Sequence, residues 1–139
     1  MAHHPPPLRI YADTSGFGGC FDREFEQHSV RFFDLVRPGR VVLLLSDLVE
    51  RELLEAPIRV RNHRASLPRS RLMAVEITEE VHLLRNAYIS AGVVGKRSLD
   101  DSMHVAAATV SRAAAIVSWN FRDIVGLHRV RGYNRSTMR

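Results

Sequence analysis

The sequence predicts an α/β fold, a three-layer sandwich with a mainly parallel central sheet. Short apolar runs typical of buried strands occur at Leu8–Ala12, Val41–Leu45 and Ala115–Ser118. Amphipathic segments with residues that favour helix starts and helix ends separate these runs. Strands that alternate with helices along the chain are typical of a parallel sheet with helical crossovers.

The helices are expected where charged and apolar residues recur at helical spacing. The first runs from Asp22 to Val36 and ends at Arg37-Pro38-Gly39, and the glycines that follow Asp13 are expected to interrupt regular structure before it. The remaining elements are expected as a helix after the N-cap Ser46, a short strand at Leu72–Val75, a helix from the N-cap Thr78 to Gly92 and a helix within Ser98–Thr109.

The composition is that of one globular domain. Of the 139 residues, 45% are hydrophobic and 25% charged, so we expect an ordered domain at residues 8–139 after a flexible tail at residues 1–7. No apolar run approaches the roughly 20 residues of a membrane span, and no signal peptide is recognisable, so we expect a cytoplasmic protein. The single cysteine, Cys20, excludes an internal disulfide and is interpreted as a packing residue.

Asp13 stands directly after the first predicted strand and directly before Thr14 and Ser15. In a parallel sheet the carboxyl ends of the strands border the crevice that ligands occupy. Asp13 is therefore well placed to form one wall of a site. The same pattern also fits a turn or a helix N-cap.

Glu52 lies three and four residues after Val49 and Leu48, so it shares the face on which that helix must pack against the sheet. An unpaired carboxylate there would cost on the order of several kcal/mol. It should therefore meet a cation, a metal ion or hydrogen-bond donors. The alternatives are an ion pair with Arg51 or Arg59, or a helix rotated so that the carboxylate lies in water.

Asp101 opens a helix rich in small residues and shares a face with Val105 and Ala108. Small side chains let that face approach the sheet closely, so we expect the Asp101 carboxylate to point inward. His104 lies one turn further along the chain. We interpret it as a packed, hydrogen-bonded histidine and not as a metal ligand, because carboxylate-rich sites suit hard cations better than imidazole does.

Three acids, Asp13, Glu52 and Asp101, are thus expected at one site, together with Asn120 and Asp123, which follow the last predicted strand. Like charges that converge repel one another, and a divalent cation removes that repulsion. Oxygen ligands of this kind suit Mg²⁺ or Mn²⁺. The chemistry that follows is metal-assisted hydrolysis of a phosphodiester bond.

The segment from Ile58 to Arg71 contains no acid and is the most basic part of the chain, and we expect a helix or loop that presents its arginines to solvent. These are Arg59, Arg61, Arg64, Arg69 and Arg71. A phosphate backbone suits such a surface, although solvated arginine faces are common. The formal net charge of +5 agrees, but every basic residue except Lys96 is arginine, a bias that genomic base composition also produces.

Four segments, YADTS, SDLVERELLEAP, DDSMHVAAATV and IVSWNFRDIV, together resemble the PIN-domain family. These are small metal-dependent ribonucleases that include the VapC-like toxins of bacterial toxin–antitoxin pairs. The resemblance extends from Leu8 to about Leu127, and the SWNF segment is similar to that of one bacterial branch of the family.

The resemblance implies that Asp13, Glu52 and Asp101 are the metal-binding acids. It places Asn120 where the family often has a fourth acid, with Asp123 three residues later, so both are candidate catalytic residues. Thr14 or Ser15 would help to hold a ligand or a metal-bound water. The implied activity is endonucleolytic cleavage of RNA that leaves a 5′-phosphate and a 3′-hydroxyl.

The resemblance also implies partners. RNA would be bound through the basic segment and through three arginines near the C-terminus, Arg129, Arg131 and Arg135. A toxin of this kind needs an antitoxin protein, which is commonly encoded beside it, and the family commonly forms homodimers.

Two other functions are compatible with parts of the sequence. One is a non-catalytic PIN-fold RNA-binding or interaction protein, whose metal site is degenerate because Asn120 replaces an acid. The other is a phosphatase or phosphotransferase of the haloacid-dehalogenase kind, suggested by an aspartate at the end of the first strand. That chemistry requires a second aspartate two residues later, where this chain has Ser15.

Overall fold

The computed structural model describes residues 6–92 and 99–119, and the strands in these ranges form one parallel sheet. They are β1 (Leu8–Ala12), β2 (Val41–Ser46), β3 (Leu72–Val75) and β4 (Ala115–Val117), and their order in the sheet is β3-β2-β1-β4. Each neighbouring pair runs parallel. The carboxyl ends of the described strands therefore meet at one edge of the sheet.

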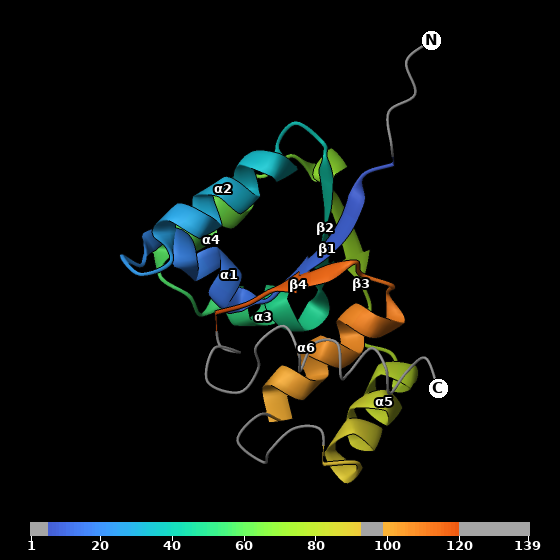
Figure 1. Ribbon diagram of the computed structural model, residues 1–139. Coiled ribbons are helices and arrows are strands. Elements are labelled where there is room, and N and C mark those ends of the chain that lie inside the picture. Colours follow the sequence, from blue (N-terminus) through green and yellow to red (C-terminus); the bar gives the residue numbers. More distant parts are fainter. Residues whose placement is uncertain (1–5, 93–98, 120–139) are drawn as a thin grey trace.

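Helices lead from each strand to the next. They are α1 (Thr14–Gly18), α2 (Glu26–Val36), α3 (Asp47–Leu54), α4 (Ile58–Ala65), α5 (Glu79–Ser90) and α6 (Leu99–Val110), with short 3₁₀ turns at η1 (Gly19–Phe21) and η2 (Arg69–Arg71). Figure 1 shows α1, α2 and α4 grouped on one side of the sheet, whereas α5 and α6 lie together away from that group, near the edge at which the strands end. The predicted α/β sandwich with a parallel central sheet is confirmed.

The core lies between the sheet and these helices. The two central strands bury Tyr11, Leu43 and Leu44 completely, as expected for strands covered on both faces. The α6 residues at positions 105–108 are buried as well, and three of the four are alanines. Small side chains allow α6 to lie close to the end of the sheet, which matters for the site described below.

Two expectations about the segment after β1 are wrong. The glycines after Asp13 do not interrupt regular structure, because the Asp13 side chain caps α1 by accepting from the Gly16 N–H. The next helix begins at Glu26 and not at Asp22. The Asp22 carboxylate accepts from the Glu24 N–H at 2.8 Å, so Asp22 belongs to a turn that precedes the helix.

Cys20 lies next to this turn and is half-buried, with its Sγ 3.6 Å from Nε2 of His63. Burial raises the pKa of its thiol to about 11, so the thiol is protonated at neutral pH. The side chain packs against the hydrophobic core, as the sequence predicts for a packing cysteine. None of the helices among the described residues has both the length and the apolar composition needed to cross a membrane.

Candidate active site

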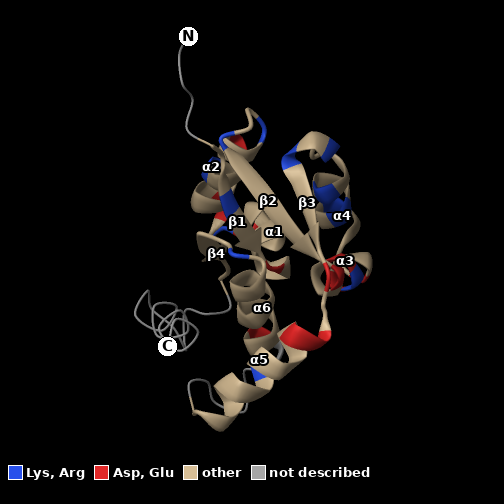
Figure 2. Ribbon diagram, turned by 90° about the vertical axis from the view of Figure 1, so that its right-hand side faces the viewer, with Lys and Arg blue, Asp and Glu red and all other residues tan. Residues whose placement is uncertain are grey.

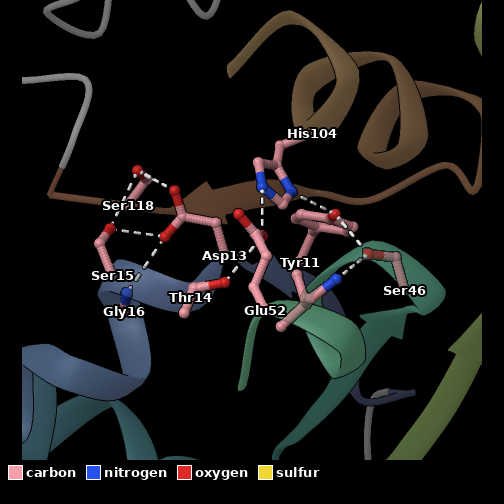
Figure 3. Close-up of polar contacts among 10 residues, drawn as sticks. Tyr11, Asp13, Thr14, Ser15, Gly16, Ser46, Glu52, His104 and Ser118 are labelled. Carbon is pink, nitrogen blue, oxygen red and sulfur yellow. Dashed lines mark hydrogen bonds and ion pairs between the residues drawn. The ribbon is translucent and has the colours of Figure 1, made fainter. Parts of the chain in front are cut away.

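Asp13 lies at the carboxyl end of β1, where it is the N-cap of α1, and only 1% of its surface is exposed. Its Oδ1 accepts the Ser15 hydroxyl at 2.6 Å and the Gly16 N–H at 3.1 Å. Its Oδ2 accepts the hydroxyl of Ser118, which follows β4 directly. Figure 3 shows these groups around the carboxylate. Asp13 thus serves as the N-cap of α1, as one of the two sequence interpretations predicts, and it also joins the ends of two neighbouring strands.

Trp119 holds the end of β4 in place beside Asp13. Its backbone N–H donates to the Ser15 hydroxyl oxygen at 2.9 Å. Its indole ring stacks on Phe25 with 4.7 Å between the ring centroids, and the indole N–H donates to the Ser29 hydroxyl at 2.9 Å. The sequence gives neither Ser118 nor Trp119 a role of its own, although both belong to the SWNF segment that contributes to the family resemblance, and Ser118 was expected as the last residue of the strand.

Glu52 reaches the same edge of the sheet from α3. Its Oε1 accepts the Thr14 hydroxyl at 2.8 Å and lies 3.0 Å from Nε2 of His104. About 36% of its side chain is exposed, and no described residue donates a hydrogen bond to Oε2. Its partners are thus a threonine and a histidine, so the alternative of a pair with Arg51 or Arg59 is wrong.

Hydrogen bonds and nearby charges keep Glu52 ionised. The hydrogen bond from His104 lowers the pKa of the Glu52 carboxyl most strongly, while partial burial acts in the opposite direction. The Thr14 hydroxyl and the nearby charge of Arg51 lower the pKa further. Glu52 is therefore a carboxylate at neutral pH, which is the form that binds cations.

His104 is buried and hydrogen-bonded on both sides of its ring, as the sequence predicts. Its Nδ1 lies 2.7 Å from the Tyr11 hydroxyl, which in turn lies 2.8 Å from the Ser46 hydroxyl. Burial raises the pKa of Tyr11, so its hydroxyl keeps its proton. The sequence indicates a hydrogen-bonded His104 and an N-cap at Ser46, but not that both belong to one network with Glu52.

The third predicted acid, Asp101, is partly buried in the first turn of α6. It lies three residues before His104, so the two residues occupy neighbouring positions on one helix face. Across residues 6–92 and 99–119, no group of three or more histidine, cysteine or acidic side chains lies close enough together to hold a metal ion. Asn120 and Asp123 lie outside the described residues, so the complete predicted set stays a prediction.

The chemistry of the donors nevertheless suits a small hard cation. Figure 3 shows the Asp13 and Glu52 side chains next to each other, and Thr14, which follows Asp13 in the chain, binds Glu52 directly. Apart from the His104 ring, both of whose nitrogens are hydrogen-bonded, the described groups here that could act as ligands are carboxylates and hydroxyls. Such oxygen ligands are those that Mg²⁺ and Mn²⁺ prefer. Two of the predicted ligands are therefore neighbours at the carboxyl edge of the sheet.

The predicted basic segment forms α4 and η2, and Figure 2 shows Lys and Arg positions gathered along α4 and near the start of β3. The expectation that all five arginines face solvent is wrong for two of them. Arg64 forms a two-point ion pair with Glu50, with N–O distances of 2.8 and 3.0 Å. The Arg71 Nε donates to the Arg37 carbonyl at 3.0 Å. Both side chains are thus engaged by other residues of the fold, and both are only partly exposed.

The other three arginines are exposed: Arg59, Arg61 and Arg69. The Arg59 guanidinium lies 5.6 Å from the centre of the Phe21 ring, which leaves its N–H groups accessible. The three arginines near the C-terminus, Arg129, Arg131 and Arg135, lie outside the described residues. The basic surface that the structure describes is therefore smaller than the sequence predicts.

Comparison with known proteins identifies the fold. No model of a known protein family and no curated protein sequence matches this chain. Among solved structures, the chain is similar to a chain in the crystal structure of VapBC2 from Rickettsia felis bound to a DNA fragment from their promoter. The TM-score is 0.55 at 12% sequence identity, and the match covers 84% of this chain and 93% of that chain. The fold of this protein is thus PIN-like.

Proposed function

We propose that this protein is an Mg²⁺- or Mn²⁺-dependent endoribonuclease and the toxin of a toxin–antitoxin pair. The observation that carries the proposal is that the Asp13 and Glu52 side chains lie near each other, at the carboxyl edge of a parallel sheet in a PIN-like fold. Ligands of open α/β sheets bind at that edge. Two neighbouring carboxylates there are suited to a divalent cation and hence to phosphodiester chemistry.

In this proposal Asp13, Glu52 and Asp101 hold the cation. When bound, Mg²⁺ or Mn²⁺ would stabilise the negative charge that develops on the phosphate and would promote attack by water. Glu52 contributes its Oε2, because Oε1 already accepts from Thr14 and His104. Asp13 is held rigidly by Ser15, Gly16 and Ser118, so its carboxylate is preorganised.

The substrate in this proposal is RNA, and the exposed arginines Arg59, Arg61 and Arg69 would contact its phosphates. The logarithm of the RNA-binding constant should fall linearly with the logarithm of the salt concentration. Each phosphate contact that is lost should make the slope of that line shallower by about one. We therefore expect Arg61→Ala to weaken RNA binding and to reduce that slope. Arg64→Ala is the matched control, because Arg64 is engaged by Glu50. An equal effect of both substitutions would contradict this assignment.

An antitoxin protein is part of the same proposal, by likeness to the Rickettsia felis complex. A groove between α3 and α4 suits an acidic amphipathic segment, because Arg51 and Arg61 border it and its apolar Leu54 side chain is 73% exposed. A homodimer is proposed as well. Mass measurement of the native protein, alone and with the product of the adjacent gene, tests both partners.

The decisive experiment is cleavage of a panel of labelled tRNA, messenger RNA and ribosomal RNA with Mg²⁺ or Mn²⁺. We expect the wild type to cut and Asp13→Asn, Glu52→Gln and Asp101→Asn to lose about 100-fold or more in rate. Glu55→Gln is the matched control, since Glu55 is exposed at the end of the same helix. Cleavage that persists in all three site variants would indicate a contaminating nuclease. No cleavage of any RNA by the wild type would contradict the proposal.

A non-catalytic PIN-fold binding protein is the second candidate. One observation favours it: both oxygens of Asp13 are already occupied by a backbone N–H and two hydroxyls, as in a purely structural N-cap. The two candidates differ in metal affinity. If titration calorimetry with Mn²⁺ finds no binding to the wild type while RNA binding persists, the binding protein is the better description.

A further inference from the structure

A chain of buried hydrogen bonds runs from the start of α3 to Glu52. The Val49 N–H donates to the Ser46 hydroxyl oxygen at 3.2 Å, and the Ser46 and Tyr11 hydroxyls are 2.8 Å apart. The Tyr11 hydroxyl lies 2.7 Å from Nδ1 of His104, and Nε2 of His104 lies 3.0 Å from Oε1 of Glu52. Ser46 and Tyr11 are completely buried and His104 is 3% exposed, so water does not compete for these bonds.

For a neutral His104 ring, the chemistry of the end groups determines the direction of each bond. The Glu52 carboxylate can only accept, so Nε2 of His104 must donate. In a neutral imidazole Nδ1 is then an acceptor, and the Tyr11 hydroxyl must donate to it. The Tyr11 oxygen in turn accepts from the Ser46 hydroxyl, whose oxygen accepts the Val49 N–H. With this assignment every buried donor and acceptor of the chain has a partner.

We propose that His104 is a positioning residue, which fixes Glu52 through Oε1 so that Oε2 is presented to the cation, and that Tyr11 and Ser46 hold the His104 ring in the tautomer this requires. The identity of Glu52 as a cation ligand rests on the proposed function. The fixed tautomer does not.

Fixing Glu52 is useful because a glutamate side chain has three rotatable bonds. Two donors from different parts of the fold hold the same oxygen: Thr14 from α1 and His104 from α6. The hydrogen bonds around a ligating carboxylate commonly contribute 10–100-fold to metal affinity. We therefore expect His104 to influence metal binding without touching the metal ion or the substrate.

The first test is the tautomer of His104 in the metal-free protein. The chain has seven histidines, and the ¹⁵N imidazole signals of His104 can be assigned by their loss in His104→Gln. We expect the Nε2–H form in the wild type. Tyr11→Phe keeps the aromatic ring but removes the hydroxyl, and should shift the ring toward a mixture of tautomers. An Nδ1–H tautomer in the wild type would overturn the proposal.

The second test is Mn²⁺ affinity by titration calorimetry. We expect His104→Leu to bind about 10–100-fold more weakly than the wild type. His104→Gln keeps an N–H donor at the position of Nε2 and should recover most of the affinity, and it also covers the case in which the leucine variant fails to fold. His63→Gln is the matched control, because His63 is also packed, with its ring 4.4 Å from that of Phe33, but lies in a different cluster.

The outcomes separate the two proposals. If the wild type binds Mn²⁺ and both His104 variants bind equally well, His104 does not position Glu52, while the proposed nuclease stands. If the wild type binds no Mn²⁺, the proposed nuclease fails, and the tautomer measurement still decides whether Tyr11 and Ser46 fix the His104 ring.

Discussion

The two carboxylates of the candidate site differ in how they are held. Asp13 is 1% exposed, and its three donors come from α1 and from the residue after β4. The Glu52 side chain, in contrast, is 36% exposed. Its Oε1 accepts from two donors, and its Oε2 accepts from none of the described residues. The comparison indicates that Asp13 stabilises the fold around it, whereas Glu52 is held by the fold and remains accessible.

The largest expected effect is on stability. Asp13→Ala leaves a buried backbone N–H and two hydroxyls without their acceptor, so we expect the free energy of unfolding to fall by about 3 kcal/mol. Glu52→Ala should cost less, about 1–2 kcal/mol, because it leaves one buried donor, the Nε2–H of His104, without its acceptor. Urea denaturation in the presence of EDTA measures both values. Equal losses would show that the two carboxylates do not differ in this way.

A smaller effect is expected at Gly19, on the Asp13 side of the site. A Cβ atom at Gly19 would lie 2.3 Å from the indole nitrogen of Trp119 and 2.3 Å from the Ser29 hydroxyl. Gly19→Ala should therefore displace Trp119 and cost about 1–3 kcal/mol. Trp119 is the only tryptophan, so its fluorescence should shift to longer wavelength.

The neighbouring glycine provides the control for this experiment. A Cβ atom at Gly18 would meet nothing within 4 Å, so Gly18→Ala should leave the fluorescence unchanged. If the comparison between the carboxylates is right, Gly19→Ala should also disturb Asp13 through Ser15, while the tautomer of His104 beside Glu52 stays as in the wild type. If Gly19→Ala changes the His104 tautomer as clearly as it changes the Trp119 fluorescence, the surroundings of Asp13 and Glu52 are not independent.

The smallest effect concerns pH. The pKa of Glu52 is lowered in the folded protein, chiefly by the hydrogen bond from His104. Its contribution to stability is therefore present above the pKa of the unfolded chain and is lost as the pH falls through the lower folded pKa. Because the side chain is exposed to solvent, we expect this contribution to be below about 1 kcal/mol.

The measurement is the stability difference between the wild type and Glu52→Gln in metal-free buffer. We expect the wild type to be the more stable protein at pH 7, with a difference that shrinks as the pH falls below about 4.5. A difference that is constant between pH 7 and pH 3 would show that the Glu52 charge contributes nothing.

Much of the fold could be predicted because its signals are local. The apolar runs at Leu8–Ala12 and Leu72–Val75 are strands with the expected bounds, and Ser46 and Thr78 cap helices as predicted. Capping and strand burial depend on residues only a few positions apart in the chain. The helix after Asp13 was not predicted because Gly16 and Gly18 indicate a break, even though Asp13 also fits a helix N-cap.

The candidate site could be predicted only in part. Asp13 and Glu52 were recognised because each follows a strand or lies on the packing face of a helix. The partners of Glu52 were not foreseen, since His104 lies 52 residues later in the chain, on α6 in the crossover that follows β3. Whether Arg64 faces solvent or pairs with Glu50 also depends on how α3 and α4 pack.

The sequence by itself therefore determined the class of fold, the position of Asp13 at the end of a strand and the acidic character of the site. Only the tertiary structure decided that Ser118 holds Asp13 and that His104 holds Glu52. The physical reason is that strand, helix and cap formation are governed by neighbours along the chain. A hydrogen bond between Asp13 and Ser118, 105 residues apart, exists only when β1 and β4 lie side by side.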